Sequence, residues 1–527
     1  MKAARLVVAG FLVFAIGCAI GPNYKRPEIE VPENFRGAPP VEPVESESTV
    51  DEEEAKQFAD LPWWEIFDDP VLVSLIEVAL QNNLNLEMAV SRTEQAYRQS
   101  RATMSGFFPQ ATYGGTAGAT QGIYPEANNN DVQYSGYAGT LNVAWEIDVW
   151  GRIRRANQSA KAQLLGAQDY QRGVLLSIVA DVASMYFLLL ELDASLEISE
   201  EAVAAFAKTK RLFKRKFEGG AASRLQLTRA AAAEAQAASW VPEVQIRIAA
   251  VENRLSTLLG RPPEGIPRGK RLIEQVLPDV PVGLPSALLE RRPDIQQAEQ
   301  RVVSANAEVG VSMGNFLPRI GLVAMYGGAS YDISTLGTSG SSSLWNIAGE
   351  MSGPIFKAGM LYSEYKARKA MWEEAKAAYE LAALTAFSEV SSKLVRRELL
   401  VEQRTARYLR VKELRDSVRL SLARYEQGLA SYFEVLEAQQ DLFPAEFDLA
   451  ETRLSELMVV VNLYRALGGG WELGLDWLPK KEEGETEGEP SSEDGSPPAS
   501  SPAEGGATDQ PSKPATSAQQ AETGTTS

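Results

Sequence analysis

The sequence predicts a mainly helical fold made of two internal repeats, each with long coiled-coil-like helices and a pair of transmembrane β-strands. Three observations predict this fold. Motifs in the first half of the chain recur in the second half at an almost constant distance. Apolar residues follow heptad spacing through two very long stretches. Short segments of alternating apolar and polar residues interrupt the helices in both halves.

The recurring motifs define the two repeats. The sequence FFPQ at 107–110 matches FLPR at 316–319, which lies 209 positions later. Further matches lie 208 positions apart and pair Gly151 with Gly359, Phe217 with Tyr425, Gly220 with Gly428, and Ser223 with Ser431. A steady offset over so long a distance indicates two copies of one structural unit.

Each repeat contains one exceptionally long helix. Residues 152–217 and 360–425 are expected to form these helices, each about 100 Å long at 1.5 Å per residue. Their heptad seams consist of Ile178, Val182, Met185, Leu189, Leu192 and Leu196, and of Val411, Leu414, Val418, Ser421 and Tyr425. A fibrous coiled coil has the same stripes, but Gly and Pro interrupt these helices at the same places in both halves. A shorter helix, at about 71–105 and 284–314, opens each repeat, and a second helix follows the long one.

The strand-like segments alternate with a period of two residues. They lie at 134–147, 320–326 and 344–355, with Gly-, Ser- and Asn-rich hairpin loops expected at 121–133 and 327–343. One face of the alternation carries the candidate lipid-facing residues Tyr137, Leu141, Val143, Trp145, Trp345 and Ile347. Such alternation fits transmembrane strands, and a half-buried soluble sheet has the same pattern. Four strands cannot close a barrel, so we expect the chain to assemble with eight strands in a dimer or twelve in a trimer.

The N-terminus has the pattern of a lipoprotein signal. Lys2 and Arg5 precede an apolar run at 6–16, and Gly17 and Cys18 follow it. This run is too short for a permanent membrane span, so residues 1–17 are predicted to be a cleaved signal. Cys18 would then carry acyl chains such as palmitate and open an extended tether at 18–60. An ordinary signal peptide with an incidental cysteine is the alternative.

Composition excludes several functions. The chain has no His and one Cys, which removes the commonest general base and leaves no thiolate cluster for a metal. Residues 480–527 hold ten acidic and three basic side chains, and residues 41–60 hold eight and one. Most of the net charge of −18 therefore belongs to these two segments, of which 480–527 is predicted to be a disordered tail. We expect no enzyme, no cofactor and no nucleic-acid partner.

Several stretches resemble the outer-membrane efflux family, the TolC-like outer-membrane factors, in its lipoprotein branch of the NodT/OprM type. The matching stretches are PWWEIFDDPVLVSLIEVALQNN from Pro62, WEIDVWGRIRRA from Trp145, LLERRPDIQQAEQ from Leu288, FLPRIGL from Phe316 and RYEQGLASYFEVLEAQQDLF from Arg424. Together they cover about 61–472 and divide it into repeats at 61–282 and 283–472.

The resemblance implies a homotrimer with a twelve-stranded barrel in the outer membrane and a twelve-helix α-barrel in the periplasm. Such a protein is the exit duct of a tripartite efflux pump. A periplasmic adaptor docks on it, an inner-membrane transporter of the RND type supplies the energy, and drugs or other small toxic compounds leave through its lumen. The duct is embedded among outer-membrane lipids and catalyses no reaction.

The resemblance also places the helical tips at Gly219, Gly220 and Gly428, where the adaptor is expected to dock. Glycine suits these positions by itself, because it adopts the left-handed conformation at a helix end without strain. Pro242 and Pro444 lie inside the helices that follow the tips, and each is expected to kink or break its helix.

A gate near the tips is implied as well, and its positions map to Phe433, Glu437 and Gln440. The family commonly has a basic residue at the last of these positions, and Gln440 cannot form an ion pair. Arg229 is the first-repeat counterpart of Glu437, so the two are expected to pair between neighbouring helix pairs. Solvated surface charges are the alternative.

Two other functions stay open. The chain could be the exit channel of a type I protein secretion system, since pore residues alone do not separate it from an efflux duct. It could also be a structural lipoprotein made of helical rods that spaces the cell envelope. The strand pairs argue against this function.

Overall fold

The computed structural model describes residues 19–32, 34–37, 67–123, 131–278, 285–338 and 341–469. The predicted signal at 1–17, Cys18, most of the tether up to residue 60 and the tail at 480–527 lie outside the described residues.

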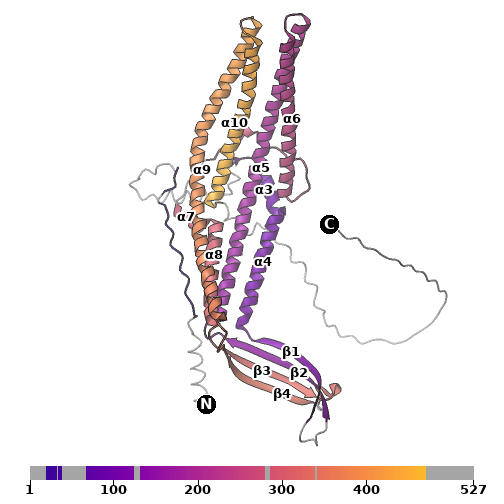
Figure 1. The fold of residues 1–527 in the computed structure, drawn as a ribbon, viewed down its shortest axis with the longest axis vertical. Coiled ribbons are helices and arrows are strands. Elements are labelled where there is room, and N and C mark those ends of the chain that lie inside the picture. Colours follow the sequence, from indigo (N-terminus) through magenta and orange to yellow (C-terminus); the bar gives the residue numbers. More distant parts are fainter. Residues whose placement is uncertain are drawn as a thin grey trace, which may run out of the picture. The chain divides into compact units, whose positions relative to one another are not determined.

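The two long helices are present as predicted. Helix α5 spans Arg152–Glu218 and α9 spans Met360–Glu426, and each has 67 residues. Helix α6, Arg224–Leu258, returns alongside α5, and α10, Tyr432–Leu467, returns alongside α9 (Figure 1). The two helical hairpins therefore run side by side.

The single helix predicted at 71–105 is wrong. The structure has α3 at Pro70–Asn82 and α4 at Leu84–Met104, with Asn83 in an extended conformation between them. The Asn83 side chain accepts hydrogen bonds from the backbone N–H groups of Asn85 and Leu86, so it caps α4. An internal capping residue breaks the helix where apolar periodicity alone continues across it.

The single helix predicted at 284–314 is wrong in the same way. Helix α7, Pro285–Arg291, and α8, Pro293–Gly314, are separated at Arg292. Because a residue before proline avoids the helical region, Arg292 is extended and Pro293 begins a new helix.

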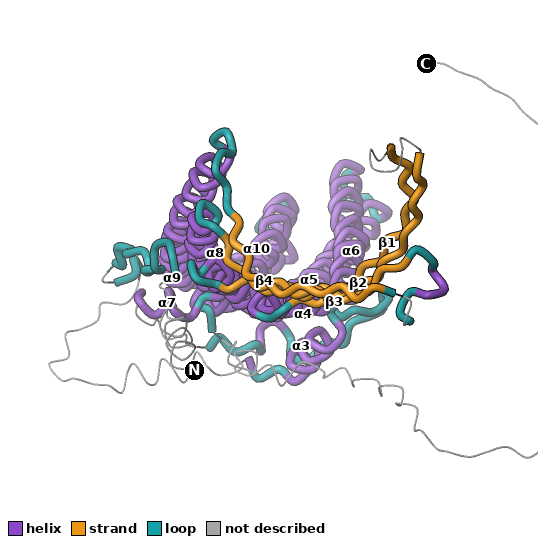
Figure 2. The backbone as a smooth tube through the Cα atoms, turned by 90° about the horizontal axis from the view of Figure 1, so that it is seen from below, coloured by secondary structure: helices purple, strands orange, loops and turns teal. Residues whose placement is uncertain are grey.

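Four antiparallel strands form one sheet in the order β1-β2-β3-β4 (Figure 2). They are β1 Gln110–Ile123, β2 Asp131–Ile147, β3 Arg319–Ser330 and β4 Ser342–Ser352. The strands reach further into the predicted hairpin loops than expected, and β4 ends before Ile355, which is fully exposed. Strands from both halves of the chain thus share a single sheet, because β2 pairs with β3.

Positions that match between the halves adopt the same backbone conformation. Gly151 and Gly359 precede the long helices with φ of 76° and 83°. Gly220 and Gly428 follow them with φ of 73° and 75°. Glycine is needed at these positions because other residues are strained at positive φ. Ser223 and Ser431 both cap the returning helix in a capping box.

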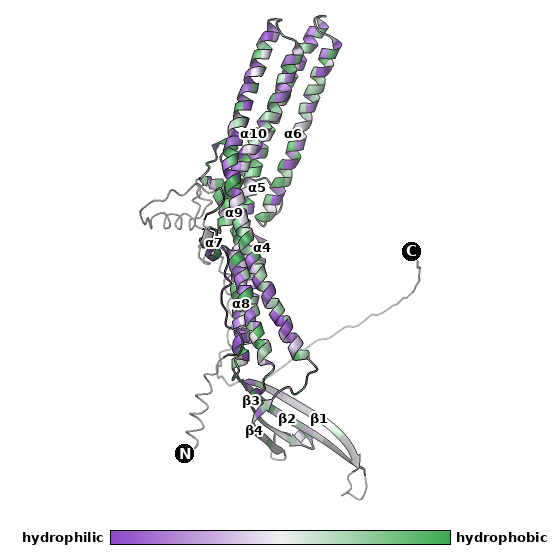
Figure 3. Ribbon diagram, turned by 60° about the vertical axis from the view of Figure 1, so that its left-hand side comes forward, coloured by the Kyte–Doolittle hydropathy of each residue, from purple (hydrophilic) through white to green (hydrophobic). Residues whose placement is uncertain are grey.

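The predicted heptad seams are packed. In α5, Ile178, Val182, Leu189 and Leu192 are buried, and in α9 Val411 is buried. The main core joins α3, α5, α9 and α10, and Figure 3 shows hydrophobic residues gathered in this middle part of the helices. Helix α5 is also long and apolar enough to cross a membrane by composition, but most of its apolar stretch is buried inside the bundle.

The prolines do not break their helices. Helix α6 continues through Pro242 and α10 continues through Pro444. A proline has no N–H, so the backbone carbonyls of Ala238 and Gln440, four residues earlier, lack their intrahelical donors. Of the predicted kink or break, the break is therefore wrong, and each helix lacks one backbone hydrogen bond at its proline.

Asp69 connects three parts of the core. Its carboxylate is fully buried and accepts hydrogen bonds from Tyr186 Oη and Gln275 Nε2, both at 2.8 Å. It also accepts from the backbone N–H of Val71 at the start of α3 and from that of Lys270. One side chain thus ties α3, α5 and the segment before α7 together.

Replacing Asp69 is expected to destabilise the helical bundle strongly. Asp69→Asn keeps the shape but places an NH2 group among donors, which should lower the free energy of unfolding by about 2–4 kcal/mol. The neighbouring Asp68→Asn is the control, because the Asp68 side chain is 81% exposed and pairs with Lys270 at the surface. The melting midpoint of each variant is measured by circular dichroism. Equal melting midpoints for the Asp69→Asn and Asp68→Asn variants would show that the hydrogen bonds of Asp69 do not stabilise the bundle.

Candidate transport path

One face of the sheet is apolar across all four strands. The register places Tyr113, Leu141, Tyr326 and Trp345 in one row. Directly opposite residues of antiparallel strands point to the same face. Tyr113 is 92% exposed and Trp345 is 72% exposed in the single chain. These large apolar side chains therefore cover a surface that nothing in the described chain shields.

The predicted lipid-facing residues all lie on this face. Val143 and Ile347 occupy the next row together with two alanines, and Trp145 lies in the row after that, opposite Leu322. Tyr137 lies opposite Ala117 and Ser330 near the far end. Sequence reasoning missed Tyr113, because alanines and glycines at the other positions of β1 hide its alternation.

The opposite face of the sheet carries mainly polar or small residues, and its larger apolar members are Val323, Met325 and Leu344. One row consists of Thr112, Asn142, Met325 and Asn346, and another contains Gly114 and Thr140. Near the helices a third row places Glu146 and Glu350 on either side of Gly321. A sheet with one apolar and one polar face is suited to separate lipid from a water-filled lumen.

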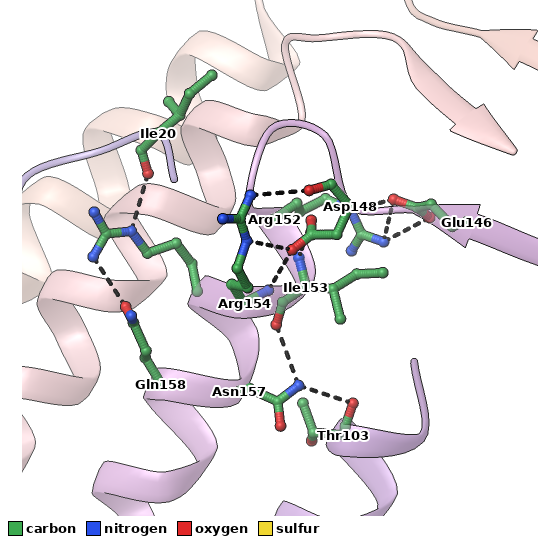
Figure 4. A network of polar contacts seen from close by, with 10 residues as sticks. Ile20, Thr103, Glu146, Asp148, Arg152, Ile153, Arg154, Asn157 and Gln158 are labelled. Carbon is green, nitrogen blue, oxygen red and sulfur yellow. Dashed lines mark hydrogen bonds and ion pairs between the residues drawn. The ribbon is translucent and has the colours of Figure 1, made fainter. Parts of the chain in front are cut away.

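A polar network joins the sheet to α5 (Figure 4). Glu146, at the end of β2, pairs with Arg152 in the first turn of α5 through contacts of 2.8 to 3.1 Å. Asp148 accepts hydrogen bonds from the backbone N–H groups of Ile153 and Arg154, both at 2.9 Å. The Arg154 guanidinium also bonds Asp148. Asp148 thus satisfies the otherwise unpaired N–H groups at the start of α5.

The N-terminal segment packs on the same region. The backbone N–H of Ile20 donates to the carbonyl of Trp150 at 3.0 Å. Arg155 is buried and donates to the carbonyls of Ile20 and Gly21 and to Asn23 Oδ1. A Cβ atom on Gly151 would lie 2.5 Å from the Ala19 Cα, so glycine permits this contact.

Beyond this region the segment follows the bundle. Tyr24 donates a hydrogen bond to Glu299, and Arg26 donates to Tyr379 Oη and pairs with Glu299 at 2.9 Å. Phe35 is buried in the main core. Residues 19–32 and 34–37 are therefore extended, as predicted, but fixed by specific contacts rather than free in solvent.

The predicted tips are the turns between the helices of each hairpin. Gly219 ends α5, and Gly220 and Gly428 adopt the left-handed conformation. A Cβ atom on Gly220 or Gly428 would meet no other atom within 4 Å, so backbone conformation and not crowding explains these glycines. The tips lie at the end of the helices away from the sheet (Figure 1).

The predicted gate residues lie on one exposed face of α10. Phe433 is 56% exposed, and Glu437 and Gln440 are also exposed. Arg229 is exposed on α6. Within the part of the chain that the structure describes, no ion pair joins Arg229 to Glu437, so one chain does not bring the pair together.

Ion pairs hold α9 and α10 together below the gate. Arg415 pairs with the buried Glu446 at 2.7 Å, and Arg410 pairs with Asp448 at 2.9 Å. Burial raises the pKa of Glu446, and the adjacent guanidinium of Arg415 opposes this shift. These pairs hold the part of α10 that follows Pro444 against α9. Among the described residues, no group of three or more potential ligands could hold a metal ion.

A lipid-compatible sheet continuous with helices of this length defines the class of the protein as an outer-membrane channel. The family model "Outer membrane efflux protein" matches residues 75–261 and again residues 284–469. The chain belongs to this family of outer-membrane efflux proteins.

Known relatives share nearly the whole chain. It is 34% identical over 472 residues to the toluene efflux pump outer membrane protein TtgC of Pseudomonas putida, covering 88% of this chain and 95% of the relative. It is 29% identical over 458 residues to the cation efflux system protein CusC of Escherichia coli, covering 86% and 96%. The solved outer-membrane channel OprN superposes with a TM-score of 0.77 at 27% identity, covering 86% of this chain and all of that one.

Asp148 provides a test of the strand-to-helix connection. Asp148→Ala should lower the free energy of unfolding by about 1–2 kcal/mol, because the first N–H groups of α5 lose their acceptor. Asp416→Ala is the matched control, since that aspartate pairs with Arg419 within the last three turns of α9 and caps no helix. It should change stability by less than about 0.5 kcal/mol. Thermal unfolding in detergent compares the two, and an equal loss would refute the capping role.

Proposed function

We propose that three copies of this chain form a continuous duct from the periplasm through the outer membrane, and that the duct exports small toxic compounds. The observation that carries this proposal is the two-faced, four-stranded sheet joined directly to two 67-residue helices. The protein is an outer-membrane efflux protein by family. The proposal adds its assembly, its path and its gate.

The open edges of the sheet support the trimer. β1 and β4 each pair on one side only within the chain. Unpaired backbone groups at a sheet edge are not tolerated in hydrocarbon, so β1 of one protomer must pair with β4 of another. A dimer would give eight strands, and side chains largely fill a barrel of that size. Three protomers give twelve strands and an open lumen, with twelve helices continuing it.

The two halves of the chain, 61–282 and 283–472, are proposed to be copies of one unit. The separate matches of one family model to each half and the shared left-handed glycines support this division. A duplicated unit gives each protomer two similar hairpins, so a trimer places six of them around one axis.

Residues 1–17 are proposed to be a lipoprotein signal, with acylation at Cys18. The next residue, Ala19, lies against Gly151 where β2 leads into α5. Acyl chains attached beside this connection would enter the membrane leaflet that the sheet crosses. The fixed segment from Ile20 to Phe35 would then join the anchor to the core. The acidic tail at 480–527 is proposed to be a separate extension.

The partners are proposed from the fold and the relatives. A periplasmic adaptor would dock at the tips, Gly219, Gly220 and Gly428, and an inner-membrane transporter of the RND type would drive export. The names of relatives mention toluene, antibiotics and cations, which favours small solutes over the secreted proteins of a type I system. A spacer lipoprotein would not explain a sheet with one polar and one apolar face.

The gate is proposed to lie at Phe433, Glu437 and Gln440. All three are exposed in one chain, so they are free to meet their copies around the trimer axis. Glu437 is proposed to pair with Arg229 of a neighbouring helix pair. One exposed ion pair contributes about 0–1 kcal/mol, and the trimer would contain three.

The lipid-facing role of the sheet is testable with two adjacent residues. Trp345→Arg should prevent stable insertion, because an arginine facing lipid destabilises a barrel by about 2–4 kcal/mol at each site. Asn346→Arg points to the opposite face and should still give trimers in the outer-membrane fraction. Membrane fractionation and unheated gel electrophoresis measure both. Insertion of the Trp345→Arg variant would rule out lipid on that face.

The gate is testable by conductance in planar bilayers. Wild type should conduct weakly, and Glu437→Ala should conduct severalfold more because the closed state loses its ion pairs. Glu413→Ala, an exposed acidic residue on α9, should behave as wild type. The charge exchange Glu437→Arg with Arg229→Glu should restore low conductance if the two residues pair.

Absence of channels in wild type and all variants, with a monomer in solution, would instead favour a spacer lipoprotein.

A further inference from the structure

An aromatic contact connects the two hairpins close to the gate. The Trp240 ring on α6 lies edge-on to the Phe447 ring on α10, with centroids 5.8 Å apart and an interplanar angle of 88°. This is a favourable geometry for two aromatic rings. Both side chains are half-buried, so the pair lies at the margin of the core rather than inside it. Among the described residues it is the one ring contact between α6 and α10.

The contact lies on the same helical faces as Gln440 of α10 and Arg229 of α6. Phe447 follows Gln440 by seven residues, which is about two turns of α10. Trp240 follows Arg229 by eleven residues, which is about three turns of α6. Residues separated by whole turns share a face, so the aromatic pair continues both the Arg229 face and the Gln440 face toward the sheet.

A proline lies beside each ring. Pro242 is two residues from Trp240, and Pro444 is three residues from Phe447. The hydrogen bond missing in α10 is the one that would hold the carbonyl of Gln440, itself a proposed gate residue. Both helices are therefore easier to bend at the level of the aromatic contact than elsewhere.

A second contact on the buried side differs from this one. Phe443 on α10 is buried against Phe206 on α5, with ring centroids 5.5 Å apart. Ion pairs such as Arg415–Glu446 tie the part of α10 that follows Pro444 to α9. The buried Phe206–Phe443 contact can persist while α10 bends. The half-buried Trp240–Phe447 contact can separate at a lower cost, because less of it is buried.

We propose that Trp240 and Phe447 form a latch that holds α10 against α6 in the closed duct and so positions the gate residues. The proposal rests on the gated duct described above and adds residues outside the gate. Opening would separate the two rings while α10 bends at Pro444. Neither side chain needs to touch the exported compound, so both are positioning residues. An edge-to-face pair is sufficient for a severalfold to about tenfold change in the ratio of open to closed duct.

The latch is testable by a double-mutant cycle in planar bilayers. Trp240→Ala and Phe447→Ala should each raise the open fraction severalfold. The double variant should open no further than either single variant, because both remove one contact. Trp240→Phe should keep low conductance. The matched control is Tyr408→Ala on α9, which removes a ring that is 62% exposed.

A merely structural role for the pair gives a different result. It would lower the melting midpoint of Trp240→Ala trimers and leave the open fraction unchanged, and this would overturn the latch. Fully additive effects of the two alanine variants would also overturn it. In either case, channel conductance by wild type or by Glu437→Ala would still support the proposed duct. Absence of channels in every variant would overturn the duct, and the latch with it.

The proline adds an independent readout. In the Trp240→Ala background, Pro444→Ala restores an N–H that can donate to the Gln440 carbonyl and stiffens α10. The open fraction should then fall toward the wild-type value although the aromatic contact is still absent. An unchanged open fraction would show that α10 does not bend at Pro444 during opening.

Discussion

Backbone hydrogen bonding in the membrane is the constraint on which the rest of this structure depends. Water cannot satisfy N–H and C=O groups inside the hydrocarbon, so a sheet can cross a bilayer only when both of its edges are paired. The chain provides four strands with free edges at β1 and β4. Assembly is thus a condition for insertion, and the apolar row from Tyr113 to Trp345 has no shelter in the single chain for the same reason.

The connection between sheet and helices fixes the direction of the helical part relative to the sheet. Asp148 caps α5 while Glu146 fixes Arg152, so the direction of a helix about 100 Å long is set within a few residues of the last strand position. The N-terminal segment packs on the same region through Arg155. The N-terminal segment, the end of β2 and the start of α5 therefore meet at one point, which fixes the sheet and the long helix relative to each other.

Away from the sheet the two hairpins are held together less uniformly. Near the middle, the Asp69 network and the large apolar core fix α3, α5, α9 and α10. Toward the tips the core narrows to aromatic and alanine contacts among α5, α6 and α10. Stability that decreases along the helices allows the tips to move while the centre stays rigid. The proposed gate and the proposed latch both lie in this part of the hairpins.

Much of the architecture was determined by the sequence itself. Heptad spacing gave both long helices to within a residue, and the matched glycines and serines marked their ends, because these signals act within a few turns of one helix. The strand faces followed from alternation, and the family from motifs in both halves. The breaks at Asn83 and Arg292 were missed, although a capping asparagine and a following proline were visible, because apolar periodicity runs across both.

Only the tertiary structure decided which elements meet. It joined strands from both halves in one sheet, packed the N-terminal segment on Gly151 and brought Trp240 against Phe447 across more than 200 residues. These contacts depend on the relative placement of whole helices, which a buried core determines and local spacing does not encode. The proposed pairing of Glu437 with Arg229 would depend in addition on the arrangement of neighbouring protomers, which a single chain does not determine.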